Sequence, residues 1–389
     1  MRPLDGIRVL DMSRVLAGPF AGRILSDLGA EVVKVEPPEG DVTRNWGKVR
    51  AGLAGFYTQQ NVGKRNVCVD LRAEGGPELV KRLAAHAHVL IENFRPGVMS
   101  RHGLGYDELS QVNPALVMVS ISGFGQDGPE SHRAAYAPIL HGETGWLRRS
   151  AEWNGHPVVD LNLSVADTTA SLHGTIGVLA ALRTAEATGR GQHIDIAMLD
   201  AFLATDDAGH VALDGLEYEG RGGLIWEGTG GPVLTAGDFR WVWRCLSQTH
   251  GIADDAGADA DIDTKRARRT VAIEAFLGSF DSRAEMTAAL DAAGLAWGDV
   301  KTVAQAYDSP TARHRGSSVE IDARDGGSRR VPQTPYRFSA ADSGVRAGAV
   351  APHRGEHNDE VLAQWLGADR HEVAALVDAG VLLATTPAG

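Results

Sequence analysis

The chain has 389 residues, of which 43% are hydrophobic and 23% charged, a balance typical of a globular enzyme with room for two domains. Its formal net charge of -12 argues against nucleic-acid binding, and no apolar run suggests a membrane span or a secretory signal. The two cysteines, Cys68 and Cys245, are far apart, so we expect a cytoplasmic protein without disulfides and without a metal site.

Alternating strand and helix patterns predict an α/β fold for the first half of the chain. Residues 6–11 and 31–36 are predicted as short buried strands, with a helix between them over 16–29. Such a β-α-β unit implies a parallel sheet with right-handed crossovers. Further strands are predicted at 66–71, 89–92, 115–122 and 193–197, and further helices at 77–87, 106–112 and 199–209. The first strand-to-helix loop lacks the G-x-G-x-x-G pattern of dinucleotide-binding proteins.

The later segments give weaker patterns. Residues 130–166 have little periodicity and are expected to be loops, where functional residues tend to lie. A glycine-rich stretch over 216–232 marks a domain boundary near residue 215. Strands are predicted around an Asp325-Gly-Gly turn within 318–338, and a helix over 361–377.

Residues 157–182 change from an irregular polar segment to a small, apolar run. Leu172, Ile176 and Leu179 fall at i, i+4 and i+7, which predicts a buried helix. Asp167 lies where the pattern changes, in the expected first turn, near unpaired backbone N–H groups. Its carboxylate is either a helix cap or a nucleophilic or acid–base group kept ionised by the helix terminus.

Short motifs then recur in order along nearly the whole chain, most weakly between residues 215 and 300. They lie at residues 3–11, 17–19, 28–37, 40–44, 61–65, 92–97, 122–125, 189–192 and 355–362. Each motif alone is weak evidence, but the ordered set resembles the family III CoA-transferases. This family includes formyl-CoA:oxalate and carnitine CoA-transferases and the related α-methylacyl-CoA racemases.

The resemblance implies a large Rossmann-like domain with a parallel sheet built from both chain ends, plus a smaller α+β middle domain. We therefore expect the N-terminal part of a CoA-binding domain over 1–215, a small domain over 216–325, and a C-terminal segment, 326–389, that returns to the large domain. The resemblance also implies an interlocked, ring-like homodimer.

For activity, the resemblance implies transfer of CoA from an acyl-CoA donor to a carboxylic acid acceptor through an aspartyl-CoA thioester. Asp167 matches the family's nucleophilic aspartate. A CoA thioester is then a substrate, no cofactor is expected to be tightly bound, and the partners are an acyl-CoA and an acid, with no nucleic acid or membrane.

The same resemblance extends to CoA binding. The family positions that contact CoA, or lie beside its adenine, correspond here to Val15, Leu16, Asn93, Phe94, Arg101 and His102. A family arginine after the 31–36 strand is replaced by Pro37, which leaves Arg14, Arg44, Lys64 and Arg65 as alternatives for the CoA phosphates.

An acyl-CoA racemase is the alternative activity, because moving a proton between two faces of a carbon takes two acid–base groups. Tyr136 and Ala137 stand where such racemases carry a histidine and an acid, which favours the transferase. Ala134 and Ala137 also differ from the lysine and glutamate of oxalate-using relatives, so oxalate is not the expected acceptor. His141 is either a second base or a structural histidine.

Three tryptophans also leave two interpretations open. Trp226, Trp241 and Trp243 either bind a large or aromatic acyl group or belong to the core of the middle domain, and we favour the core.

Overall fold

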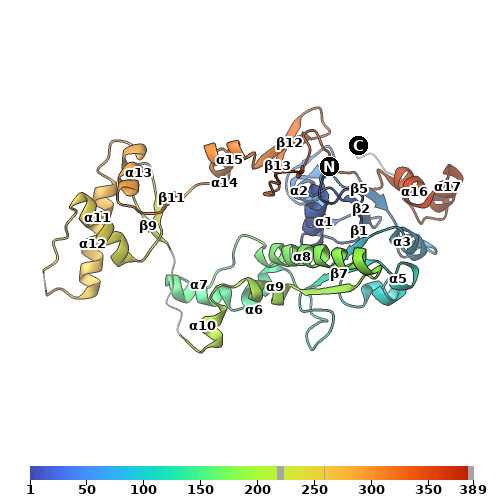
Figure 1. The fold of residues 1–389 in the computed structure, drawn as a ribbon, viewed down its shortest axis with the longest axis horizontal. Helices are drawn as coiled ribbons and strands as arrows, with labels where there is room; N and C mark the ends of the chain where they lie inside the picture. Colours follow the sequence, from blue (N-terminus) through green and yellow to red (C-terminus); the bar gives the residue numbers. More distant parts are fainter. Residues whose placement is uncertain (217–222, 258, 384–389) are drawn as a thin grey trace. The chain divides into compact units, whose positions relative to one another are not determined.

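The computed structural model describes residues 1–216, 223–257 and 259–383 (Figure 1). The chain divides into two compact units, Met1–His210 with Arg313–Gly389, and Val211–Ala312. The first unit is therefore built from both ends of the chain. The short helices α10 (Gly209–Leu213) and α15 (Pro310–Arg315) lie where the chain passes from one unit to the other.

A six-stranded sheet forms the centre of the first unit. Its strands are β1 (Arg8–Asp11), β2 (Glu31–Glu36), β5 (Arg65–Cys68), β6 (Val89–Glu92), β7 (Val117–Ser122) and β8 (His193–Ala197). Their order is β5-β2-β1-β6-β7-β8, and every neighbouring pair is parallel. β6 and β7 are buried along their whole length, as strands are when helices cover both faces of a parallel sheet. The predicted α/β fold with a parallel sheet is confirmed.

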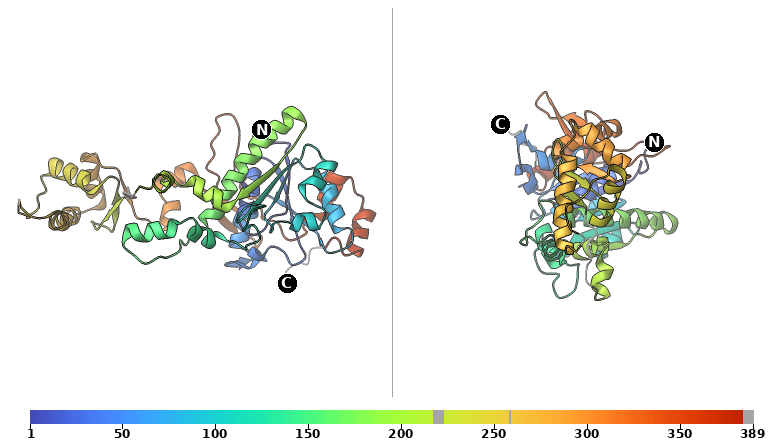
Figure 2. Two further views of the ribbon diagram at one scale, coloured as in Figure 1. Left: turned by 90° about the horizontal axis from the view of Figure 1, so that it is seen from below. Right: turned by 90° about the vertical axis from the view of Figure 1, so that its left-hand side faces the viewer.

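Two separate apolar clusters cover the two faces of this sheet. One is formed with α1 (Ala17–Asp27), α6 (Ala137–Glu143), α8 (Val165–Thr188) and α9 (Met198–Thr205). The other is formed with α3 (Gly76–Ala84), α5 (Tyr106–Val112), α16 (Asn358–Leu366) and α17 (Arg370–Asp378). Figure 2 shows α8 running alongside the strands.

The C-terminal segment joins the first unit without adding a strand to the six-stranded sheet. We expected both chain ends to build the sheet, but all six strands come from residues 8–197, and up to residue 383 the C-terminal segment pairs with this region through one isolated bridge, between Leu382 and Val69. The returning part of the chain begins at Arg313, earlier than the expected 326, and contributes α16, α17 and the predicted hairpin of β12 (Ser318–Asp322) and β13 (Ser328–Pro332). The hairpin packs against β4 (Leu53–Ala54) and α2 (Gly55–Asn61), which follow η1 (Val42–Asn45) and β3 (Val49–Arg50) in the chain.

Helix α8 exposes the apolar face that we expected to be buried. Leu172, Ile176 and Leu179 are 43%, 62% and 37% exposed. The face toward the sheet consists of smaller residues, and a Cβ added at Gly174 or Gly177 would lie 3.4 or 3.3 Å from Ile121 or Ile194. Small side chains let the helix approach the strands closely, which leaves the larger apolar residues outside.

Two further expectations need correction. Residues 130–166 include α6 and α7 (Trp146–Asn154) rather than loops alone. Their lengths of 7 and 9 residues are too short to give a clear periodicity. The helix expected over 361–377 is divided into α16 and α17 at Gly367, whose φ of 68° ends the first helix.

The second unit combines a small antiparallel sheet with helices. Its strands are β9 (Leu224–Trp226), β10 (Val233–Thr235) and β11 (Trp297–Asp299), and its helices are α11 (Phe239–His250), α12 (Ile262–Leu277), α13 (Arg283–Ala292) and α14 (Val303–Tyr307). Trp226 is buried in the core of this unit and Trp243 packs against it, whereas Trp241 is 44% exposed. The core interpretation therefore holds for Trp226 and Trp243.

No helix in the described ranges is long and apolar enough to cross a membrane. The same residues contain no group of three or more His, Cys, Asp or Glu side chains placed to hold a metal ion.

Candidate active site

A pocket opens at the carboxyl ends of the strands, where the strand order reverses. From β1 the chain builds outward to β2 and β5, and it then returns to place β6 on the other side of β1. The loops after β1 and β6 therefore diverge, which is where open α/β sheets bind ligands. Arg14 and Val15 follow β1, and residues 93–96 follow β6; all of them line the pocket.

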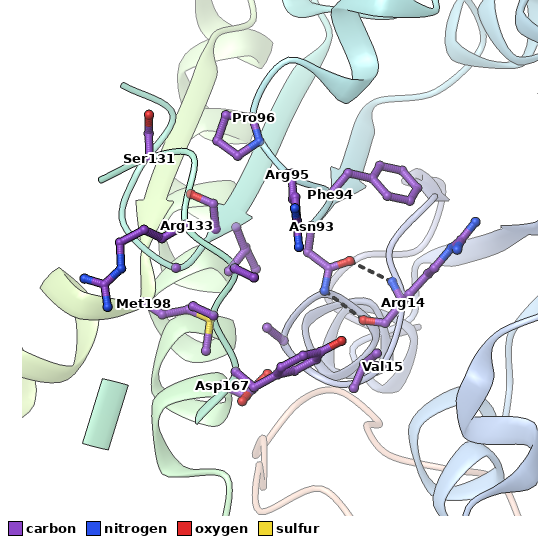
Figure 3. Close-up of a pocket in the computed structure, with 17 residues that line it drawn as sticks. Arg14, Val15, Asn93, Phe94, Arg95, Pro96, Ser131, Arg133, Asp167 and Met198 are labelled. Carbon is purple, nitrogen blue, oxygen red and sulfur yellow. Dashed lines mark hydrogen bonds between the residues drawn. The ribbon is translucent and has the colours of Figure 1, made fainter. Parts of the chain in front are cut away.

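The carboxylate of Asp167 lies in this pocket, on the first turn of α8 (Figure 3). Its side chain is only 8% exposed. Burial raises the pKa of Asp167 to about 6, although the backbone N–H groups of Ala137 and Ala17 and the nearby His141 ring act in the opposite direction. The group is therefore ionised at neutral pH but poorly solvated, which favours nucleophilic attack.

Two other helices begin beside the same carboxylate. Ala17 is the first residue of α1 and Ala137 the first of α6, and first-turn N–H groups have no partner within their own helix. The Ser171 hydroxyl fixes α8 against α1, because its single proton is shared between the carbonyl oxygens of Ala17, at 2.5 Å, and Asp167, at 2.7 Å. The arrangement holds backbone donors near Asp167 in a fixed geometry.

Asn93 joins the two loops of the pocket. Its Oδ1 accepts the N–H of Arg14, and its Nδ2 donates to the carbonyl oxygen of Arg14, both at 2.7 Å (Figure 3). The preceding Glu92 accepts the N–H of Phe94 at 2.8 Å. Burial raises the pKa of Glu92 to about 7, against the opposing effect of bonds from Ser120 and Phe94.

The structure brings together five of the eight site residues expected from the sequence. Asp167, Tyr136, Val15, Asn93 and Phe94 all line the pocket. The remaining three are not among its lining residues. Leu16 is buried, Arg101 ends the short helix α4 (Val98–Arg101), and His102 follows that helix.

The cations of the pocket differ from those proposed for the CoA phosphates. Arg44 is paired with Glu36 at 2.8 Å, Lys64 with Asp11 at 2.8 Å, and Arg65 with Glu360 at 3.1 Å. Of the four alternatives, only Arg14 lines the pocket.

Arg95 and Arg133 also line the pocket, and both were missed from the sequence. Arg133 is held by Glu130 at 2.8 Å and Glu143 at 2.6 Å. Within the described part of the chain, Arg14 and Arg95 take part in no ion pair, and the Arg14 guanidinium lies 5.4 Å from the Phe94 ring centre. The position of Arg95 directly after Asn93-Phe94 was the available signal.

His141 is a structural histidine rather than a second base in the pocket. It is fully buried, its Nε2 accepts the N–H of Ala166 at 3.3 Å, and its Nδ1 lies 2.9 Å from Asp160 Oδ1. Because Nε2 accepts a hydrogen bond, the ring proton is on Nδ1, which donates a hydrogen bond to Asp160. His141 thus binds a free N–H of the first turn of α8. Asp167 is the only carboxylate among the residues that line the pocket, and no histidine lines it.

Comparisons with known proteins agree on one family. The sequence model of CoA-transferase family III matches residues 4–220 and 233–358. The succinyl-CoA–D-citramalate CoA-transferase of Chloroflexus aurantiacus is 31% identical over 96% of this chain and 97% of its own length. The succinate–glutarate CoA-transferase of Agrobacterium fabrum is 33% identical over 93% and 95%. The crystal structure of a CaiB/BaiF family protein from Brucella suis superposes with a TM-score of 0.81 at 32% identity, covering 94% of this chain and 99% of the other.

Proposed function

The chain is an enzyme that belongs to CoA-transferase family III, and we propose that it moves CoA between carboxylic acids through a thioester on Asp167. The observation that carries the proposal is the buried Asp167 carboxylate, placed between the first N–H groups of α1 and α6 in the pocket. A carboxylate is a weak nucleophile in water, and desolvation with fixed positioning is what makes it reactive.

In the first half-reaction, an Asp167 oxygen attacks the thioester carbonyl of the donor. The carbon–sulfur bond breaks, which leaves a mixed anhydride on Asp167 and free CoA thiolate. The thiolate then attacks the Asp167 carbonyl carbon, the donor acid leaves as a carboxylate, and an aspartyl-CoA thioester remains. The second half-reaction runs these steps in reverse with the acceptor acid and restores the Asp167 carboxylate.

Each step passes through a tetrahedral oxyanion, which needs hydrogen-bond donors fixed in advance. The N–H groups of Ala17 and Ala137 are suited to this role, because they already face the Asp167 carboxylate. Donors of this kind require no reorganisation when the charge develops. Tyr136, which is 62% exposed, would cover the pocket beside Asp167.

For CoA itself, we assign the end of the pocket formed by Arg14, Val15, Asn93, Phe94 and Arg95. Phe94 offers an apolar surface, and Arg14 and Arg95 offer charges for the diphosphate. The Leu16 backbone, Arg101 and His102 would then contact the outer parts of CoA. Arg133, whose charge Glu130 and Glu143 already balance, is less suited to a phosphate.

The relatives suggest which acids to test first. Their names specify succinyl-CoA or succinate together with D-citramalate or glutarate, so we propose short dicarboxylic acids as the substrate class. Ala134 lines the pocket and Ala137 opens α6, so the lysine and glutamate of oxalate-using relatives are absent here. Oxalate is therefore not the expected acceptor.

We further propose an interlocked homodimer, located in the cytoplasm. The exposed face of α8, formed by Leu172, Ile176 and Leu179, supports the dimer, because such apolar surface on a helix commonly marks an interface. Cys68 and Cys245 are both free thiols, which fits a reducing compartment.

Intact-protein mass spectrometry tests the proposed reaction. After incubation with succinyl-CoA or glutaryl-CoA, the enzyme should gain the mass of one CoA less one water, and hydroxylamine should remove it. Asp167→Ala should remain unlabelled, whereas Asp200→Asn, at an exposed position of α9, should label normally. If no donor labels the protein and the α-proton of an acyl-CoA exchanges with deuterated water instead, the transferase proposal fails.

A further inference from the structure

The turn between β1 and α1 has a strained backbone at Val15. Its φ is 67°, in the left-handed region, and the other described non-glycine residues with positive φ are Ala51 and Arg324. Val15 is the only β-branched residue of the three, and a branched Cβ makes this conformation especially unfavourable. Such a conformation persists only where the surroundings enforce it.

Asp41 supplies one of the contacts that enforce it. Its carboxylate oxygens accept the N–H of Val15 at 3.2 and 3.4 Å. The Asn93 amide holds the residue before, Arg14, by two bonds. Arg14 and Val15 are therefore fixed from two sides by side chains that come from other parts of the chain.

The Asp41 carboxylate is itself fixed by buried partners. Lys34 Nζ lies 3.3 Å away, and both side chains are fully buried. Asp41 also accepts the Thr43 N–H at 3.0 Å and the Thr43 hydroxyl at 2.8 Å. Lys34 in turn donates to the carbonyl oxygen of Ser13 at 2.7 Å, so the pair holds the turn at two points, Ser13 and Val15.

Both members of this pair are charged. Burial opposes ionisation, but Lys34 holds the pKa of Asp41 below its usual value, and Asp11 and Asp41 hold the pKa of Lys34 above its own. A buried ion pair contributes little net stability compared with apolar residues, so its most direct effect here is on geometry.

The geometry in question belongs to the active site. Arg14 and Val15 line the pocket, and two residues after Val15 the N–H of Ala17 faces the Asp167 carboxylate. If the turn relaxed to an ordinary φ at Val15, the start of α1 would change direction relative to α8. A small displacement of a donor from a developing oxyanion is costly for the rate.

We propose that Asp41 is a positioning residue for catalysis. With Lys34 behind it, Asp41 holds the Val15 N–H and keeps the turn in its left-handed conformation, which directs the Ala17 N–H at Asp167. This inference rests on the proposed function, because Asp167 chemistry is the reaction that it aligns. Asp41 contacts no substrate in this scheme and does not line the pocket.

A double-mutant cycle with Val15→Gly tests the proposal, because glycine adopts a positive φ without strain. In the native background, Asp41→Ala should lower kcat by roughly 10²-fold. In the Val15→Gly background, the same substitution should cost less than about fivefold. Asp41→Asn, which keeps an acceptor oxygen for Val15, should retain more kcat than Asp41→Ala.

Two results would overturn the assignment. One is an equal loss of kcat on Asp41→Ala in both backgrounds, and the other is a loss confined to KM. Far-UV circular dichroism establishes that each variant is folded, and if Asp41→Ala is not, the charge-balanced pair Lys34→Met with Asp41→Ala takes its place in both backgrounds. Failure of the proposed function looks different, because then the native enzyme itself forms no CoA adduct.

Discussion

Asp167→Asn should stabilise the protein while abolishing transfer. The native structure buries a carboxylate whose pKa is raised from 3.8 to about 6, because burial disfavours its ionised form. Asparagine has nearly the same shape and carries no charge, so the cost of burying the charge disappears. The exposed fraction of 8% means that solvent screens little of this cost.

The change in the free energy of unfolding can be worked out from the shift in the Asp167 pKa. Because the pKa is raised, ionisation of Asp167 destabilises the native fold. Each pKa unit corresponds to about 1.4 kcal/mol, so the penalty on the native fold reaches about 3 kcal/mol when Asp167 is fully ionised. Below about pH 3 both the folded and the unfolded chain are protonated at residue 167, and the penalty vanishes. As the pH rises from about 4 to about 6, the unfolded chain ionises first and the native protein loses stability relative to the variant.

Urea unfolding of both proteins at several pH values measures this difference. The stability advantage of Asp167→Asn should grow by about 2 kcal/mol between about pH 4.5 and pH 8, with most of the gain below pH 6. Any pH-independent cost of an imperfect amide hydrogen bond cancels in this comparison. Asp200→Asn serves as the control, since it removes the same charge from an exposed position.

An advantage that is constant with pH would refute the reasoning, because it would mean that Asp167 is not desolvated in the folded protein. The companion measurement is kcat/KM of the native enzyme. It should fall about tenfold per unit below pH 6, as the nucleophile becomes protonated.

Three further predictions concern other parts of the first unit. Burial raises the pKa of Glu92 to about 7, so Glu92→Gln should raise the free energy of unfolding by up to about 3 kcal/mol above pH 7 and by little below pH 4.5. Urea unfolding of both proteins above pH 7 and below pH 4.5 measures this difference. Arg14→Met should weaken CoA binding about tenfold, as measured by calorimetry. The matched control Arg133→Met should weaken it less than about threefold, because Glu130 and Glu143 already balance the charge of Arg133. Equal losses in the two variants would contradict the assignment of the CoA-binding end of the pocket. Ile176→Glu should yield folded monomers by light scattering, since this side chain is 62% exposed on α8; an unchanged mass would remove α8 from the interface.

Local patterns in the sequence were enough to predict the parallel sheet and the place of Asp167. Strands such as β6 and β7 begin with three consecutive apolar residues, and helix ends are marked by residues such as Pro19 and Gly29, so the β-α-β units could be identified. The change of pattern at Asp167 coincides with the first turn of α8. The pocket loop after β6 could also be predicted from the sequence, because Asn93 and Phe94 directly follow the last residue of that strand.

The buried face of α8 could not be predicted in the same way. Periodicity shows that Leu172 and Ile176 share a face, but it does not show what that face contacts. The sheet instead receives the face with Gly174 and Gly177, whose lack of side chains permits close packing. Sequence reasoning gives weight to large apolar residues and therefore chose the wrong side.

Contacts between residues far apart in the sequence could not be predicted either. Asp41 accepts a hydrogen bond from Val15, which lies 26 positions earlier in the chain, and Asn93 accepts one from Arg14, which lies 79 positions earlier. Both contacts arise because parallel strands bring their carboxyl ends to one edge of the sheet, where successive loops converge. The motif at 40–44 was visible in the sequence, but its link to the β1–α1 turn depends on the order of the strands.

Two costly features of the first unit converge on the same pocket. Asp167 is ionised where burial opposes its charge, and Val15 adopts a conformation that its branched side chain disfavours. Neither feature contributes to stability, and each is enforced by contacts from several elements: the starts of α1 and α6 around Asp167, and Asp41 and Asn93 around Val15. Strain that is held in place from several directions at a ligand pocket is characteristic of preorganisation for chemistry. The two are also joined by two residues of backbone, from Val15 to Ala17, so a change at Asp41 should alter the rate at Asp167 without touching the substrate.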